Sequence, residues 1–148
     1  ISIHNHLIAE LEKLDSEYQY ILIDVAGRDS EIFREALLIS DKLIIPTQAS
    51  LLDLDVIPYL NEKVKTAKKT NPNLVSMVVI NRASTNAKSN ETEQAREFVA
   101  DYEEFKLLQT TLHERKQYRD AVLESKSVLE MAASKAKDEL NQFLIEVL

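Results

Sequence analysis

Short apolar runs alternate along this chain with stretches of helical periodicity. The runs lie at 20–24, 42–46, 74–80 and, less strongly apolar, 105–111. Unbroken runs of this length predict strands that are covered on both faces, as in parallel sheets. Because right-handed crossovers return the chain over the sheet, the carboxyl ends of such strands gather at one edge. The sequence therefore predicts an α/β fold, with a mainly parallel sheet between helical layers.

Helical spacing of apolar residues predicts helices between these runs, over 3–15, 29–40, 51–69, 90–101, 115–124 and 127–148. Pro58 interrupts the third of them. Proline is tolerated only in the first turn of a helix, so this helix either starts near Asp55 or kinks. Ser127 and Glu130 have the spacing of a capping box, which predicts that the last helix opens there.

The composition narrows the class of protein. A length of 148 residues predicts a single domain over 1–148, and the net charge of −7 argues against strong chain-wide affinity for nucleic acid. A local basic patch stays possible. The chain has no cysteine, which excludes disulfides and cysteine metal sites, and its apolar runs are too short to span a membrane.

Gly27 is the only glycine in the chain. A phosphate-binding loop of the G-x-x-x-x-G-K-[ST] type needs at least two glycines, so this sequence contains none. The sequence also starts at Ile1 rather than at a methionine, in what reads as the middle of a domain. We therefore expect a fragment, or a product trimmed at its N-terminus.

A carboxylate and this glycine follow the first apolar run. Asp24 ends the run and Gly27 comes three residues later. An acid at the carboxyl tip of a strand can hold Mg²⁺ through water, and a flexible backbone N–H nearby can meet a terminal phosphate. The alternative is a buried strand that runs into an ordinary turn, where Asp24 caps the loop and Gly27 only permits the turn.

An ordered series of motifs resembles the ParA family of partitioning ATPases, whose relatives include the MinD cell-division ATPases. The series comprises the strand with Asp24-x-x-Gly27, the segment 40–46 (SDKLIIP), the segment 48–54 (QASLLDL), the strand that ends in Asn81-Arg82, and Thr110-Thr111-Leu112, Arg115, Tyr118, Ala121 and Ser127-Val128 downstream. The likeness extends from Leu7 to the end of the sequence. It implies a three-layer P-loop NTPase-like fold, of which this sequence is the C-terminal portion, without the opening strand and the deviant Walker A loop.

The resemblance also implies site residues. Asp24 is similar to the Walker B aspartate that holds Mg²⁺ through water, and Gly27 to the switch residue that senses the γ-phosphate of ATP. Pro46, Asn81 and Arg82 follow strands at the nucleotide edge, where the family contacts adenine. The alternative for Asn81 is an ordinary turn residue, and for Arg82 a solvated side chain.

A basic set near the C-terminal third has two interpretations. In several family members this region faces DNA or the dimer partner, which makes Arg115, Lys116 and Arg119 contact candidates. Acidic residues interleave with them, so an exposed helix of mixed charge is the alternative. The three histidines, His4, His6 and His113, have no spacing typical of a zinc site.

The resemblance implies an ATP-dependent plasmid or chromosome partitioning protein. Such a protein forms a homodimer on binding ATP and Mg²⁺, binds DNA nonspecifically, works with a ParB-type centromere-binding protein, and is cytoplasmic and nucleoid-associated. Without its phosphate loop, this fragment is not expected to hydrolyse ATP. Two alternatives stay open: a MinD-like regulator at a membrane, which the acidic C-terminal segment disfavours, and a non-catalytic α/β binding module.

Overall fold

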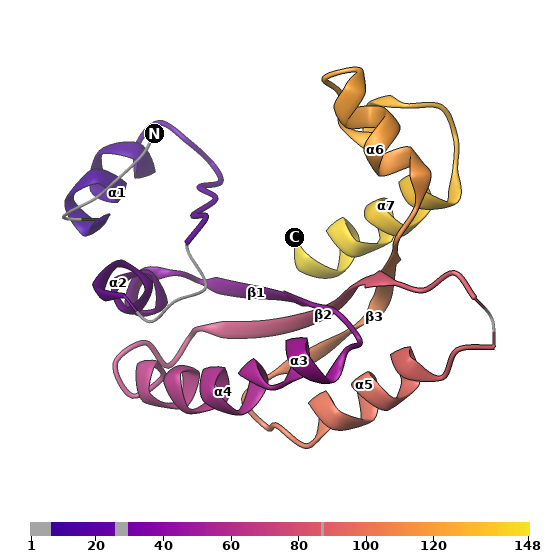
Figure 1. Cartoon of the computed structure of the whole chain (residues 1–148). Coiled ribbons are helices and arrows are strands. Elements are labelled where there is room, and N and C mark those ends of the chain that lie inside the picture. Colours follow the sequence, from indigo (N-terminus) through magenta and orange to yellow (C-terminus); the bar gives the residue numbers. More distant parts are fainter. Residues whose placement is uncertain (1–6, 26–29, 87) are drawn as a thin grey trace.

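A parallel three-stranded sheet forms the centre of the protein. The computed structural model describes residues 7–25, 30–86 and 88–148. Within these ranges the strands are β1 (Lys42–Thr47), β2 (Val75–Ala83) and β3 (Lys106–His113), in the order β1-β2-β3 (Figure 1). Lys42 pairs with Val75, and the register continues in parallel to Thr47 opposite Ile80. The predicted α/β class, consistent with a P-loop NTPase-like fold, is confirmed.

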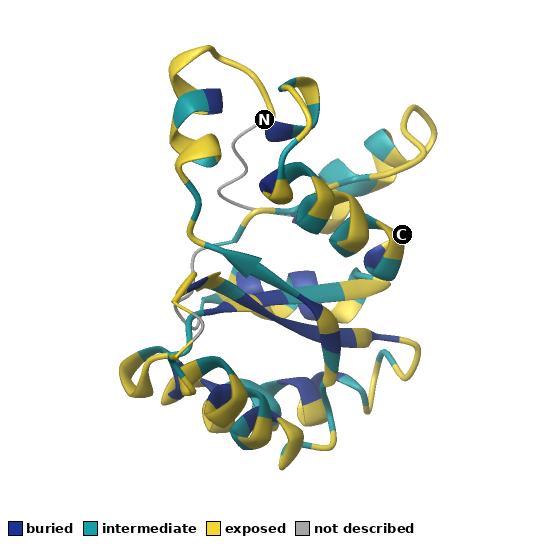
Figure 2. Cartoon of the chain, turned by 90° about the vertical axis from the view of Figure 1, so that its right-hand side faces the viewer, coloured by how far each residue is buried: buried dark blue, intermediate teal, exposed yellow. Residues whose placement is uncertain are grey.

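Helices cover both faces of this sheet. They are α1 (Leu7–Asp15), α2 (Glu31–Ile39), α3 (Leu51–Leu54), α4 (Val56–Ala67), α5 (Glu91–Ala100), α6 (Lys116–Leu123) and α7 (Lys135–Val147), with the 3-10 helix η1 (Val128–Glu130). On β2, Val78 and Ile80 pack among residues of α3, α4 and α5, while Met77 and Val79 pack with Val147 of α7. Figure 2 shows the buried residues gathered on the strands and on the inner sides of these helices. The strand is apolar on both faces because each face meets a helical layer.

The first apolar run does not form the predicted strand. Residues 20–25 carry no strand or helix, and the segment lies apart from β1 in Figure 1. Leu22 is 92% exposed and Tyr20 is 67% exposed. An apolar run becomes a strand only when a neighbour accepts and donates its backbone hydrogen bonds. β1 pairs with β2, and within the described ranges no strand pairs with 20–25.

The regular helix around Pro58 starts near Asp55, which was one of the two predicted outcomes, whereas the last helix starts later than predicted. The helix expected over 51–69 is divided at Asp55 into α3 and α4, which places Pro58 in the first turn of α4, where proline fits. The capping box at Ser127 is present but opens η1, and α7 begins only at Lys135 after the cap Ser134. Val128 of η1 packs with Ala121 and Ala136, so tertiary packing interrupts a helix that local propensity would continue.

Side chains close helix ends at the amino end of the sheet. Asn71 Nδ2 donates to the carbonyls of Leu37 and Ser40 at 3.1 and 2.9 Å, where α2 ends. Lys42 Nζ donates to the carbonyl of Val147 at 2.7 Å, at the end of α7. Helix carbonyls in the last turn lack intrahelical partners, so these contacts satisfy them. They fix α2 and α7 to the sheet and leave the carboxyl edge free for a site.

Among the helices that the structure describes, none has the length and apolar character needed to cross a membrane.

Candidate functional site at the carboxyl edge

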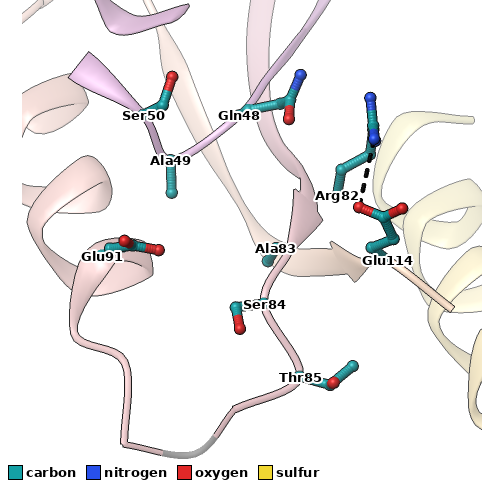
Figure 3. A pocket seen from close by; sticks show the side chains of 9 residues that line it. All are labelled: Gln48, Ala49, Ser50, Arg82, Ala83, Ser84, Thr85, Glu91 and Glu114. Carbon is teal, nitrogen blue, oxygen red and sulfur yellow. Dashed lines mark hydrogen bonds and ion pairs between the residues drawn. The ribbon is translucent and has the colours of Figure 1, made fainter. Parts of the chain in front are cut away.

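A cavity of about 380 Å³ lies beyond the carboxyl ends of the strands (Figure 3). Residues that follow or end all three strands line it, together with the start of α5: Gln48, Ala49, Ser50, Arg82, Ala83, Ser84, Thr85, Glu91 and Glu114. In open parallel sheets, ligands bind in the crevice at this edge, because the loops there leave the strands in divergent directions. The topology therefore makes this cavity the candidate ligand site.

Arg82 has an unusual backbone conformation in the wall of this cavity. Its φ angle is 53°, in the left-handed region that disfavours residues with a Cβ. Its backbone N–H donates to Asn81 Oδ1 at 2.9 Å, and its Nη2 donates to Glu114 Oε2 at 3.3 Å. A strained residue of this kind costs on the order of 1–3 kcal/mol and persists only where its surroundings hold it. Asn81 thus shapes the wall through the backbone of Arg82.

The structure separates the residues predicted to share one site. Arg82 lines the cavity, and Asn81 supports it without lining it. Pro46 is exposed and lies within β1, one residue before the end of the strand. Asp24 is exposed and lines a different, apolar cavity of about 310 Å³, formed with α1 and Ile32 of α2. Gly27 lies outside the described residues.

Asp24 alone supplies too few ligands for a Mg²⁺ site. Asp24 offers one exposed carboxylate, and no group of three or more histidine, cysteine or acidic side chains is gathered anywhere in the described part of the chain. Mg²⁺ keeps several waters and binds through one or two carboxylates plus substrate phosphates. Asp24 therefore suits only a Mg²⁺ ion that is already bound to the phosphates of a nucleotide, whose negative charge the ion would neutralise.

The predicted contact residues of the basic set are all engaged by carboxylates. Arg115 is 19% exposed, and its Nη2 lies 2.5 Å from Glu139 Oε1. Lys116 and Arg119 are 77% and 66% exposed and pair with Asp120 and Glu114 at 3.4 and 3.5 Å. This pairing fits the mixed-charge helix better than a bare basic patch. Contact with DNA or a partner stays a prediction.

Glu139 on α7 binds the end of β3 and the start of α6 together. It accepts from the backbone N–H of His113 at 3.2 Å and lies 2.9 Å from His113 Nδ1. Arg115 Nε donates to it at 3.1 Å as well. Burial opposes ionisation of Glu139, but the hydrogen bonds from Arg115 and His113 together outweigh it and lower the pKa of the carboxyl. The Arg115 pKa rises, chiefly through its hydrogen bond to Glu139.

Glu146, near the C-terminal end of α7, accepts backbone hydrogen bonds from β3. It accepts from the backbone N–H groups of Gln109 and Thr110 at 2.7 and 2.8 Å and from the Thr110 hydroxyl. Burial again opposes ionisation, and these three hydrogen bonds outweigh it, so the pKa of Glu146 is lowered. The register between β2 and β3 shifts between Val78 and Ile80, which lie opposite Leu107 and Thr111. Gln109 and Thr110 belong to this irregular part of β3, and the carboxylate satisfies their backbone donors.

These two carboxyls predict a loss of stability in acid. Because their folded pKa values lie below the ordinary glutamate value of about 4.3, the folded state is favoured while both are ionised. That contribution is fully present above the unfolded pKa and disappears as the pH falls through the folded values. The urea midpoint should therefore fall between about pH 5 and pH 3. A midpoint that holds constant or rises over this range would contradict the prediction, and Glu139→Gln should flatten the slope.

Most of the cavity wall was absent from the sequence-based site. Gln48, Ser50, Ser84, Thr85, Glu91 and Glu114 line it, and none was a predicted site residue. A usable signal existed, because Gln48 and Glu114 directly follow β1 and β3, and Ser84 directly follows β2. Taking the residues just beyond every strand end, rather than family motifs alone, would have found these three.

Comparison with known proteins assigns the family. Residues 2–129 match the MipZ family, described as "ATPase MipZ". The chain is 30% identical over 148 residues to the "Maintenance of carboxysome distribution protein A" of Halothiobacillus neapolitanus (strain ATCC 23641 / c2), which covers 98% of this chain and 67% of that protein. The resemblance to ParA-like ATPases is thereby confirmed, while its deviant Walker A loop stays a prediction. The chain belongs to the MipZ family of ParA-like ATPases.

Proposed function

We propose that this chain is part of an ATP-dependent positioning protein of the ParA type, in which the cavity at the carboxyl edge takes the nucleoside end of ATP. The observation that carries the proposal is the place of the cavity, beyond all three parallel strands of a chain that belongs to an ATPase family. Nucleotides bind at this edge in open α/β sheets.

The charges around the cavity favour the nucleoside over the phosphates. The lining holds one cation, Arg82, and two carboxylates, Glu91 and Glu114. Carboxylates repel a triphosphate, whereas the hydroxyl, amide and guanidinium groups of Ser50, Gln48 and Arg82 suit the neutral edge of a base or a ribose. Arg82 can also stack on a purine face.

The phosphate end is assigned to the segment after Asp24. In this proposal Asp24 holds a nucleotide-bound Mg²⁺ through water, and Gly27 meets the γ-phosphate through its backbone N–H. Both assignments rest on the Asp24-x-x-Gly27 spacing and on the family, since ATPases of this kind work by placing phosphates and Mg²⁺.

The cargo is proposed to be DNA. The ParA resemblance supports plasmid or chromosome partitioning by a cytoplasmic, nucleoid-associated protein that dimerises on ATP, binds DNA nonspecifically and responds to a ParB-type partner. One observation favours a second cargo: the relative described above is named for carboxysome distribution, so a protein body is the alternative. Retention of the ATP-bound protein on nonspecific DNA, lost on raising salt, supports the DNA-based mechanism.

Nucleotide binding to the chain tests the proposal. Titration calorimetry with adenosine, ADP and ATP–Mg²⁺ should show binding of all three. Arg82→Ala should weaken the binding of each by about fivefold, which corresponds to the loss of about 1 kcal/mol for one hydrogen bond. Lys65→Ala is the matched control, because Lys65 is an exposed cation in the last turn of α4. Absence of adenosine binding at millimolar concentration, or equal loss in both variants, would contradict the proposed site.

A further inference from the structure

One carboxylate outside the strands lies between two guanidinium groups. Glu114 Oε2 is 3.3 Å from Arg82 Nη2, and Glu114 Oε1 is 3.5 Å from Arg119 Nη1. Arg82 belongs to the wall of the cavity, and Arg119 belongs to α6. Figure 3 shows the contact between Arg82 and Glu114 at the side of the cavity away from Glu91. A single side chain therefore joins the cavity to a helix that does not line it.

The backbones that carry this contact are held in place. The Glu114 N–H donates to the carbonyl of Ala83 at 2.9 Å, which fixes the residue to the end of β2. Its neighbour Arg115 is bound by Glu139, and Arg82 is held through Asn81. Because the backbones of Glu114 and Arg82 are both held by hydrogen bonds, a change in the partner of Glu114 requires only a movement of its side chain.

The two ion pairs are weak enough to exchange. Arg82, Glu114 and Arg119 have side chains that are 56%, 48% and 66% exposed. Ion pairs at such exposure contribute about 0.2–1 kcal/mol each. Each arginine uses a different oxygen of the carboxylate. A ligand that drew the Arg82 side chain into the cavity would break its ion pair with Glu114. The carboxylate of Glu114 would then pair with Arg119 alone.

α6 depends on few attachments. Its start is held by Arg115 on Glu139, and Ala121 packs with Val128 and Ala136. Half-buried Tyr118 packs against the same residues, and its hydroxyl donates to the carbonyl of Ala136 at 3.5 Å. Val122 and Leu123 are 75% and 84% exposed, and Figure 1 shows α6 beyond the carboxyl end of β3, apart from the sheet. With so little buried surface, the local stability of α6 responds to a single ion pair.

We propose that Glu114 is a positioning residue that couples occupancy of the cavity to the stability of α6. The ligand side of this inference rests on the proposed nucleotide function. Loss of Arg82 from Glu114 strengthens the pair between Glu114 and Arg119 and stabilises α6. In the reverse direction, loss of Arg119 leaves Glu114 paired with Arg82 alone and weakens ligand binding, because the coupling between the cavity and α6 is reciprocal.

Hydrogen exchange tests the coupling without any ligand. In Arg82→Gln, the amides of residues 116–124 should exchange about two- to fivefold more slowly than in the unaltered chain, and in Glu114→Gln correspondingly faster. Raising ionic strength from about 0.1 to 1 M shortens the Debye length from about 10 to 3 Å and should remove both differences. Unchanged exchange over 116–124 in Arg82→Gln would overturn the inference.

Nucleotide affinity tests the reverse direction. Arg119→Gln should weaken ADP binding about two- to fivefold, and Glu114→Gln should strengthen it by a similar factor. In the Glu114→Gln background, Arg119→Gln should have no further effect, because the relay is already broken. Lys116→Gln is the control on the same helix, since Lys116 pairs with Asp120 and should leave affinity unchanged.

The two arms separate this inference from the proposed function. If exchange over 116–124 responds as expected while the chain binds no ADP, the coupling stands and the nucleotide function fails. If ADP binds while Arg119→Gln and Lys116→Gln have equal affinities, the coupling is overturned and the nucleotide function stands.

Discussion

Glu139→Gln is expected to lower the free energy of unfolding by about 2–3 kcal/mol. Glu139 and Arg115 are only 18% and 19% exposed, so removal of the carboxylate leaves the Arg115 charge with little water to replace its partner. The variant also gives up the charge on the acceptor that holds His113 at the end of β3. Urea denaturation followed by far-ultraviolet circular dichroism measures the loss.

Two comparisons make this expectation specific. Glu97→Gln, at an exposed position of α5, should change the free energy by less than about 0.5 kcal/mol. The double variant of Glu139→Gln with Arg115→Gln should lose less than the sum of the single variants, because each single change already breaks the pair. A loss at Glu139 no larger than that at Glu97 would show that the contact does not hold α6 and α7 to the sheet.

Leu108→Ala should lower the free energy of unfolding by about 3 kcal/mol. Leu108 is fully buried on β3 and packs with Met77 and Val79 of β2 and with Val147 of α7. Truncation removes apolar contacts of the side chain with both the sheet and α7, and it leaves a cavity between them. For a chain of this length, the melting temperature should fall by about 6–12 °C, as calorimetry would show.

A surface leucine provides the control for this substitution. Leu123→Ala on α6, where the side chain is 84% exposed, should cost less than about 0.5 kcal/mol. The backbone carbonyl of residue 108 still accepts from Arg96 Nη1 in Leu108→Ala, so the change tests packing alone. Equal effects at both leucines would mean that α7 does not bury β3 as described.

Patterns that depend on neighbours in sequence were predictable. The runs at 42–46, 74–80 and 105–111 became β1, β2 and β3, with ends displaced by a few residues. The helix predicted over 29–40 became α2, and Ser30 caps it, with its Oγ accepting from the N–H of Phe33 at 3.1 Å. Such features need only a few adjacent residues, whose propensities act whatever the rest of the chain does.

Features that depend on partners far along the chain were not predictable. The run at 20–24 is as apolar as a strand, yet no described strand pairs with it. The capping box at Ser127 forms, yet Val128 packs under α6 and the helix stops after Glu130. In both cases the local pattern was satisfied and a distant contact, missing or present, set the outcome.

The candidate site shows the same division. The sequence by itself determined that the strands are parallel, that their carboxyl ends share one edge, and that Arg82 lies at that edge. Only the tertiary structure decided that Asp24 and Arg82 line different cavities and that Glu114 joins Arg82 to Arg119. The parallel direction of the strands follows from the alternation of apolar runs and helices and from the handedness of crossovers, which the order of elements along the chain is enough to apply. Side-chain pairing follows from the crossing of segments 32 residues apart, which no local rule specifies.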